Sequence, residues 1–222
     1  MTTHLSMLEA LDLECVRGER RLFHHMNFTL AAGTLMHVAG ANGSGKTSLL
    51  RMLCGLLAPE HGEIRWRGEN IRNLREEYWK ELVYIGHLNA LKDELSALDN
   101  LIIAAGLNGV SVAPDAAGDA LAQFGLAGFE HAPVKTLSQG QKRRVTLARL
   151  ALSRDVPLWI LDEPFTALDS AAVERLEGLL MQHIARGGSV IFTTHQEVAL
   201  TARVTLRVDL NAELDSVSPV SC

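Results

Sequence analysis

The stretch that most constrains the fold runs from Thr34 to Leu57 and reads TLMHVAGANGSGKTSLLRMLCGLL. It opens with an apolar run over 34–39, which is typical of a strand buried on both faces. It closes over 47–57 with leucines at helical spacing. Between these segments, residues 40–47 match the pattern G-x-x-x-x-G-K-[ST] at every fixed position. The stretch therefore predicts a strand, a tight loop and a helix.

The residue types of this loop suit a bound triphosphate. Glycines let the backbone turn tightly, so that successive N–H groups and the helix N-terminus point at an anion. Lys46 is expected to reach the β- and γ-phosphates, and the Thr47 hydroxyl to ligate Mg²⁺. An ordinary glycine turn is the alternative, but the strand, loop and helix in order favour nucleotide binding. The predicted ATP-binding residues here are Gly40, Ala41, Asn42, Gly43, Ser44, Gly45, Lys46, Thr47 and Ser48.

Composition and charge exclude few classes of protein. The 222 residues, 47% of them hydrophobic, are enough for one large α/β domain or two small ones. A formal charge of -5 argues weakly against nucleic-acid binding. No apolar run approaches the roughly 20 residues that span a bilayer, and the start lacks the features of a signal peptide. The cysteines form no C-x-x-C pair, which favours a reduced compartment; they are Cys15, Cys54 and Cys222.

The remaining patterns predict an α/β fold with a helical insert. Strands are predicted over 7–15, 27–30 and 63–67, buried core strands over 82–85, 158–161 and 189–194, and an edge strand over 204–210. Helices are predicted from Ser96 through 100–105, over 116–124, from Ser138 to about Leu152, and over 171–185. Residues 88–154 contain no predicted strand, so they form the insert within a single domain over 1–222. The last dozen residues show no pattern.

Two acids follow the predicted strand over 158–161. A carboxylate that leaves the end of a buried strand beside a phosphate loop can hold Mg²⁺, and Asp162 has this position. Glu163 would point elsewhere and could accept a proton from an attacking water molecule. The alternative is that the two acids simply begin a loop. The phosphate loop elsewhere in the sequence favours the functional interpretation over this one.

The segment Leu137–Gln141, LSQGQ, identifies a family. Ser138 and Gln141 make a capping box, which by itself is structural. In company with the other motifs, the segment resembles the signature loop of ATP-binding cassette (ABC) ATPases, usually LSGGQ. Asp169 ends a triplet that resembles the loop after the carboxylate motif, and His195 resembles the switch histidine. The resemblance covers essentially the whole chain and implies the ABC type of P-loop NTPase fold, with a mostly parallel core sheet and an N-terminal antiparallel β portion.

The resemblance also implies a head-to-tail dimer of the chain with two Mg-ATP at its interface. Each phosphate loop would face the partner copy's signature loop, so a single copy could not complete its own site. The ATP-binding residues would then include Ser138, Gln139, Gly140, Gln141 and Asp169. Glu163 would be the general base, with His195 and Lys46 as the other catalytic residues.

Within this family, the chain most resembles the ATP-binding subunit of the haem exporter of cytochrome c biogenesis. The matching stretches are CVRGERRLF, YIGH with ALKDELSALDNL, and LWILDEPFTALD with TTHQ. The resemblance implies a separate membrane-spanning subunit and a peripheral position on the cytoplasmic face of the bacterial inner membrane. No haem ligand is expected, because adjacent His24 and His25 would point to opposite faces of a strand. The other histidines, apart from His195 and His87, are predicted to be core or surface residues.

Three departures from the family pattern leave questions open. No glutamine follows the strand over 82–85, so His87, Asn89 or water alone would replace its contact with Mg²⁺. The aromatic residue that stacks on adenine is missing, and Arg17 occupies about its position, either stacked on the base or solvated. Gln139 replaces a signature glycine. The alternatives are an exporter of different cargo, a nucleotide-gated interaction module with little turnover, and a soluble cassette of DNA repair or translation.

Overall fold

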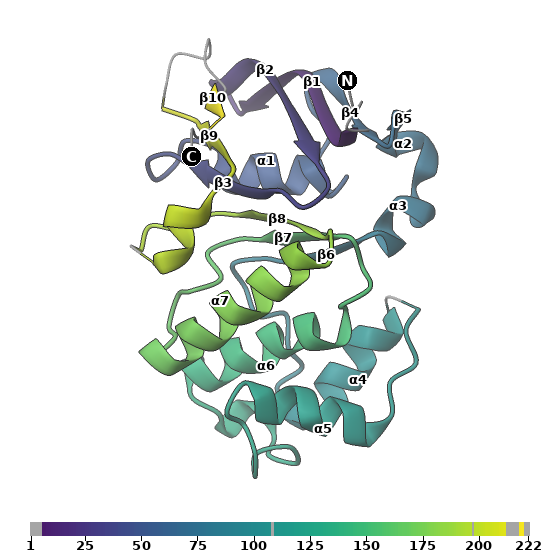
Figure 1. Cartoon of the computed structure of the whole chain (residues 1–222), viewed down its shortest axis with the longest axis vertical. Coiled ribbons are helices and arrows are strands. Elements are labelled where there is room, and N and C mark those ends of the chain that lie inside the picture. Colours follow the sequence, from purple (N-terminus) through teal and green to yellow (C-terminus); the bar gives the residue numbers. More distant parts are fainter. Residues whose placement is uncertain (1–5, 108, 197, 212–217, 220–222) are drawn as a thin grey trace.

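Two sheets and a layer of helices are stacked in the computed structural model, which describes residues 6–107, 109–196, 198–211 and 218–219 (Figure 1). Sheet A has the order β2-β1-β4-β5 and is antiparallel. Its strands are β1 (Ser6–Arg17), β2 (Arg20–Ala31), β4 (His61–Trp66) and β5 (Glu69–Asn70). It lies above helix α1 (Lys46–Leu53) in Figure 1. This sheet is the predicted N-terminal antiparallel portion.

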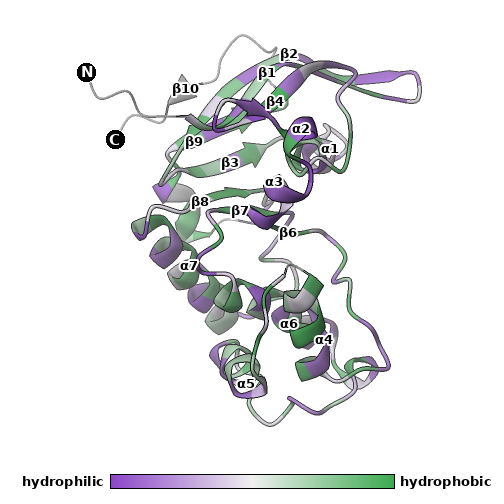
Figure 2. Cartoon of the chain, turned by 90° about the vertical axis from the view of Figure 1, so that its right-hand side faces the viewer, coloured by the Kyte–Doolittle hydropathy of each residue, from purple (hydrophilic) through white to green (hydrophobic). Residues whose placement is uncertain are grey.

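Sheet B is the core sheet, with the order β10-β9-β3-β8-β7-β6. Its parallel strands are β3 (Leu35–Ala39), β6 (Leu82–Ile85), β7 (Leu158–Leu161), β8 (Ser189–Phe192) and β9 (Leu206–Asp209). The two-residue β10 (Ser218–Pro219) pairs antiparallel with β9. Figure 2 shows sheet A and α1 on one side of this sheet and the large helices on the other. The predicted mostly parallel core sheet is confirmed.

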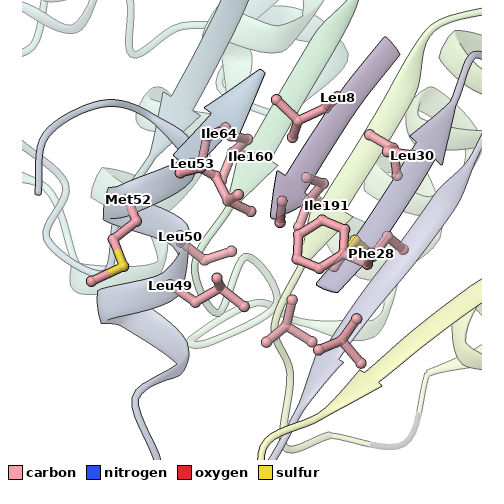
Figure 3. Packing of buried hydrophobic residues seen from close by; sticks show 14 of the residues in the cluster. Leu8, Phe28, Leu30, Leu49, Leu50, Met52, Leu53, Ile64, Ile160 and Ile191 are labelled. Carbon is pink, nitrogen blue, oxygen red and sulfur yellow. The ribbon is translucent and has the colours of Figure 1, made fainter. Parts of the chain in front are cut away.

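Side chains of sheet B alternate between two apolar clusters. In β7, Leu158 and Ile160 join the cluster that contains α1 and sheet A, whereas Trp159 and Leu161 join the cluster of the large helices. Figure 3 shows Ile160 of this strand packed near Ile191 and the leucines of α1. Because both faces are covered, β6 and β7 are continuous apolar runs rather than alternating ones.

The second cluster unites the helical insert with the core sheet. The insert consists of α4 (Ala97–Leu107), α5 (Pro114–Gln123), the short η1 (Val134–Thr136) and α6 (Gln139–Leu152). Helix α7 (Ser170–Ala185) packs on α6 and follows β7. Among the described residues between β6 and β7 there is only the isolated bridge Ser96–Pro133 and no strand. The insert and sheet B thus share one apolar cluster, and a single domain over 1–222 stays a prediction.

Helix α1 is shorter than predicted. It ends at Leu53, because Gly55 has φ 71° and turns the chain away. The Gly55 N–H donates to the Met52 carbonyl at 2.9 Å and the Leu56 N–H to the Arg51 carbonyl at 2.8 Å, the hydrogen bonds of a Schellman C-terminus. Leu56 is 59% exposed, so its place in the predicted helical stripe was wrong.

The edges of the sheets also differ from prediction. Strand β2 begins at Arg20 rather than Asn27, since it pairs with β1 along its length. Between Leu13–Met26 and Cys15–Phe23, β2 carries one extra residue. Both His24 and His25 are exposed at this bulge, and their ring centroids are 5.0 Å apart, so they do not point to opposite faces. Strand β9 is not the edge, because β10 pairs with it.

Short elements around β5 were not predicted. They are α2 (Ile71–Leu74) and α3 (Glu76–Lys80), and η2 (Ala199–Arg203) near the end of the chain is a further one. Most of the patternless last dozen residues lie outside the described residues, as does Cys222. The other two cysteines are buried and free.

Candidate functional site

The phosphate loop joins the carboxyl end of β3 to the start of α1. Gly45 has φ 107°, and a Cβ there would approach Leu22 to 3.2 Å and the Phe23 ring to 3.3 Å. A larger residue would therefore strain the backbone and press against Leu22 and Phe23 of β2. Glycine at this position therefore lets the loop backbone lie close against β2 without strain.

Lys46 is the first residue of α1 and is held inside the loop. Its Nζ donates to the Gly40 carbonyl at 2.7 Å and to the Ala41 carbonyl at 3.1 Å. Only 8% of the residue is exposed. Its positive charge is thus fixed at the N-terminus of α1, where the helix dipole also favours an anion.

Asp162 ties the loop to the neighbouring strands. It follows β7 and is 2% exposed. Thr47 Oγ1 donates to Asp162 Oδ2 at 2.8 Å, and Thr193 Oγ1 donates to Asp162 Oδ1 at 2.9 Å. The three residues meet because β3, β7 and β8 are parallel and their carboxyl ends share one edge of the sheet.

The Thr47–Asp162 pair fits Mg²⁺. Hydroxyl and carboxylate oxygens are the hard ligands that this ion prefers, and it commonly takes few of them from protein. Across the described part of the chain, no three His, Cys, Asp or Glu side chains are grouped to hold a metal. The remaining ligands at this pair would therefore be phosphate oxygens and water.

Glu163 has an unusual backbone and a cavity-facing carboxylate. Its φ is 49°, a left-handed value that is uncommon outside glycine. Its N–H donates to Thr193 Oγ1 at 2.9 Å. Its Oε2 accepts from the His195 N–H at 3.3 Å, and Oε1 lies 3.4 Å from His195 Nε2. The side chain is 16% exposed, so the carboxylate is sheltered yet reachable, as a general base must be.

One cavity of about 490 Å³ joins these groups. This volume lies within the usual range of small-molecule sites. The predicted residues that line it are Asn42, Gly43, Gly45, Lys46, Thr47, Ser48, Asp162, Glu163 and His195. Gly40 and Ala41 contribute through their contacts with Lys46. Ser44 Oγ is buried without a hydrogen-bond partner in the described structure.

Leu22, Thr166 and Gln196 also line the cavity and were missed by the sequence analysis. Thr166 follows the carboxylate motif and Gln196 follows His195, so proximity to those residues was the available signal. Leu22 comes from β2, and only the register of sheet A brings it to Gly45.

The structure bears differently on the missing glutamine after β6 and on the missing adenine-stacking aromatic residue. His87 lines the cavity, whereas Asn89 does not and its Oδ1 lies 3.5 Å from Arg143 Nη1. Of the two candidates for the missing glutamine, His87 therefore has the better position. Arg17 is exposed at the end of β1 and is not among the cavity-lining residues, so its stacking on adenine stays a prediction.

The signature loop lies outside this cavity. Gln141 N–H donates to Ser138 Oγ at 3.2 Å and Ser138 N–H to Gln141 Oε1 at 2.8 Å, which confirms the capping box of α6. Gln139 is exposed and Gly140 half-buried. Asp169 caps α7, accepting from the Ala172 N–H at 2.8 Å. None of these residues lines the cavity of its own chain.

Comparisons with known proteins agree with this geometry. The profile of the ABC transporter family matches residues 23–166. A protein of Nitrosospira multiformis named cytochrome c biogenesis ATP-binding export protein CcmA is 53% identical over 203 residues, with 91% of this chain and 98% of that protein covered. Its namesake in Dechloromonas aromatica is 57% identical over 196 residues, covering 88% and 96%.

A solved structure shares the fold. The dimeric ATP-binding cassette MJ0796, described as a post-hydrolysis state bound to ADP and Pi, has a TM-score of 0.83. It is 22% identical, and the match covers 97% of this chain and 100% of that one. At this identity the likeness supports the fold alone.

Proposed function

Because the chain belongs to the ABC transporter family, we propose that it is the ATP-hydrolysing subunit of a haem exporter in cytochrome c biogenesis. It would dimerise around two Mg-ATP and drive a separate membrane subunit. The observation that carries the proposal is the convergence of Lys46, Thr47, Asp162 and Glu163 on one cavity. The export process comes from the name of relatives that are 53% and 57% identical.

The geometry suggests a role for each residue in the cavity. Lys46 and the amides at the start of α1 would bind the β- and γ-phosphates. Thr47 and Asp162 would hold Mg²⁺, which when bound supplies charge neutralisation to the phosphates. Glu163 would accept the proton of the attacking water, and the adjacent His195 would contact the γ-phosphate.

The dimer is supported by the position of the signature loop. Ser138 and Gln139 are exposed at the N-terminus of a 14-residue helix, away from their own cavity. A helix N-terminus attracts anions, so this one is suited to the γ-phosphate held by another copy. MJ0796, which shares the fold, is described as a dimer.

The membrane partner would bind an exposed apolar face on α4, and exposed Leu88 is a second apolar candidate for its contact. Ile103 and Leu107 lie one turn apart on α4 and are 45% and 84% exposed. Leu88, in the loop after β6, is 79% exposed. The structure's described residues include no helix that is long and apolar enough to cross a membrane. We therefore propose that the chain sits peripherally on the cytoplasmic face of the inner membrane, held by its partner.

Replacing Leu107 with Glu is expected to weaken assembly with the membrane subunit by at least tenfold. The reason is that a buried unpaired charge at an interface costs several kcal/mol, whereas one tenfold step corresponds to about 1.4 kcal/mol. Gln182→Glu, which adds the same charge at an exposed position of α7, is the matched control. Co-purification from detergent-solubilised membranes measures the effect. Equal recovery of the partner with both variants would show that this face is not the interface.

The proposal as a whole is tested by purifying the intact complex from membranes and identifying what accompanies the chain. A membrane-spanning subunit and ATPase activity that depends on it are expected. The absence of glutamine after β6 favours one alternative, a nucleotide-gated module with little turnover. A complex that binds ATP but turns it over no faster than its Glu163→Gln form would support that alternative instead.

A further inference from the structure

Arg143 is a buried cation that the mechanism above does not use. It lies on α6, two residues after the capping box, and is only 4% exposed. Burial lowers the pKa of its guanidinium, and the nearby charges of Asp162 and Glu163 oppose that shift. A buried charge is costly unless it is hydrogen-bonded, so the contacts of this side chain are informative.

The guanidinium donates to backbone on both sides of Glu163. Nη2 donates to the Asp162 carbonyl at 3.0 Å and to the Glu163 carbonyl at 2.8 Å. These carbonyls belong to the two peptide planes that meet at the Glu163 Cα. The mutual orientation of the two planes is set by φ and ψ of Glu163, so one nitrogen that binds both carbonyls fixes that backbone conformation.

The conformation so fixed is the left-handed one. A non-glycine residue at φ 49° is strained by about 1 kcal/mol or more and persists only when its surroundings hold it. Thr193 holds the N–H of Glu163 at 2.9 Å and Arg143 holds its carbonyl. The direction of the carboxylate into the cavity depends on this backbone.

The same guanidinium reaches the loop that lacks the glutamine. Nη1 donates to the Gly86 carbonyl at 3.0 Å and lies 3.5 Å from Asn89 Oδ1. Arg143 therefore joins three segments: the loop after β6, the carboxylate motif after β7, and the helix that presents the signature loop.

We propose that Arg143 is a positioning residue that aims the Glu163 carboxylate by clamping the carbonyls on either side of it. The proposal rests on the proposed role of Glu163 as general base. Arg143 would also connect the helical insert directly to that base, because a shift of α6 would move the guanidinium that binds the two carbonyls.

Arg143→Lys tests the proposal, because an ammonium keeps the charge but lacks the planar fork that serves three carbonyls. We expect kcat to fall about 10–100-fold with the KM for ATP within about threefold, as expected when a catalytic group is misplaced by a fraction of an ångström to about 1 Å. Arg149→Lys, the same exchange at a half-buried position of α6, should keep the parent rate.

The decisive readout is the effect of Arg143→Lys in the Glu163→Gln background. If the arginine acts through Glu163, the exchange should change the residual single-turnover rate less than about threefold, because the group that it aims is already disabled. A full 10–100-fold loss in that background would overturn the proposal, and so would an unchanged kcat in the parent background. A parallel loss of Mg-ATP affinity, measured with a fluorescent ATP analogue, would indicate a merely structural role and also overturn it.

Two further measures keep the outcomes separable. If Arg143→Lys lowers the thermal unfolding temperature too far for kinetics, Arg143→Gln, which can still donate to one carbonyl, replaces it under the same criteria. If Glu163→Gln alone leaves the hydrolysis rate unchanged, Glu163 is not the general base and the proposed function is contradicted. If Glu163→Gln is slow but Arg143→Lys is not, only the positioning role fails.

Discussion

The Glu163→Gln variant is expected to hydrolyse ATP about 10²–10⁴-fold more slowly than the parent and to bind Mg-ATP as tightly, since glutamine fills the same space but cannot accept the proton. That loss corresponds to about 3–5 kcal/mol of barrier. The prediction depends on the position of the carboxylate at the cavity, 3.4 Å from His195 Nε2. Phosphate release under saturating Mg-ATP measures the rate.

Glu174→Gln is the matched control for this exchange. Glu174 is exposed on α7, away from the cavity, so the same change in chemistry should leave the rate within about twofold of the parent. Hydrolysis by Glu163→Gln at the rate of the control would remove Glu163 from its proposed role.

The Lys46→Ala variant is expected to lose both binding and turnover. A charge-assisted hydrogen bond to phosphate is worth about 1.5–3 kcal/mol, so the affinity for Mg-ATP should fall about 10–150-fold. The rate should fall a further 10²–10³-fold, because the lysine would also stabilise charge in the transition state. Equilibrium binding of a fluorescent ATP analogue separates the affinity from the rate.

Arg51→Ala removes a positive charge from an exposed position on the same helix and serves as the control. It should change affinity for Mg-ATP less than threefold, because exposed charges outside the site are screened. Tight ATP binding by Lys46→Ala would contradict the assignment of the phosphate loop.

How much of the fold was predictable depended on which forces act on each segment. The strands over 82–85 and 158–161 were predicted to the residue, because sheet B is buried on both faces. The start of α6 after Ser138 was predicted because Ser138 caps the helix through its own neighbours in sequence. Strand β2 was mostly missed. Its polar first half is a strand only because β1 pairs with it, and pairing partners are not visible in local sequence.

The site residues also divide into those that local sequence predicts and those that only distant contacts bring to the site. The motif residues that follow β3 and β7 were predicted, because parallel strands bring their carboxyl ends together. Leu22 and Arg143 were not, because each reaches the site across the fold, one from sheet A and the other from the insert. Arg143 stands between Lys142 and Arg144 at the start of α6, and nothing in this basic run indicates that its middle residue is buried.

In the proposed dimer, two copies of the chain build each ATP site together. Ser138 lies outside its own cavity, so the variant Ser138→Asp should damage only the site of the other copy. Aspartate keeps the N-cap of α6 but places a negative charge where the γ-phosphate would lie, whereas the control Ser138→Asn keeps the cap without the charge.

Mixing Lys46→Ala with Ser138→Asp tests whether two copies share each site. Each variant alone should be nearly inactive, but half of the randomly mixed dimers would pair one of each and contain one intact site of two. The 1:1 mixture should therefore recover up to about a quarter of the parent's ATPase rate. A mixture no more active than its separate components would contradict the shared site.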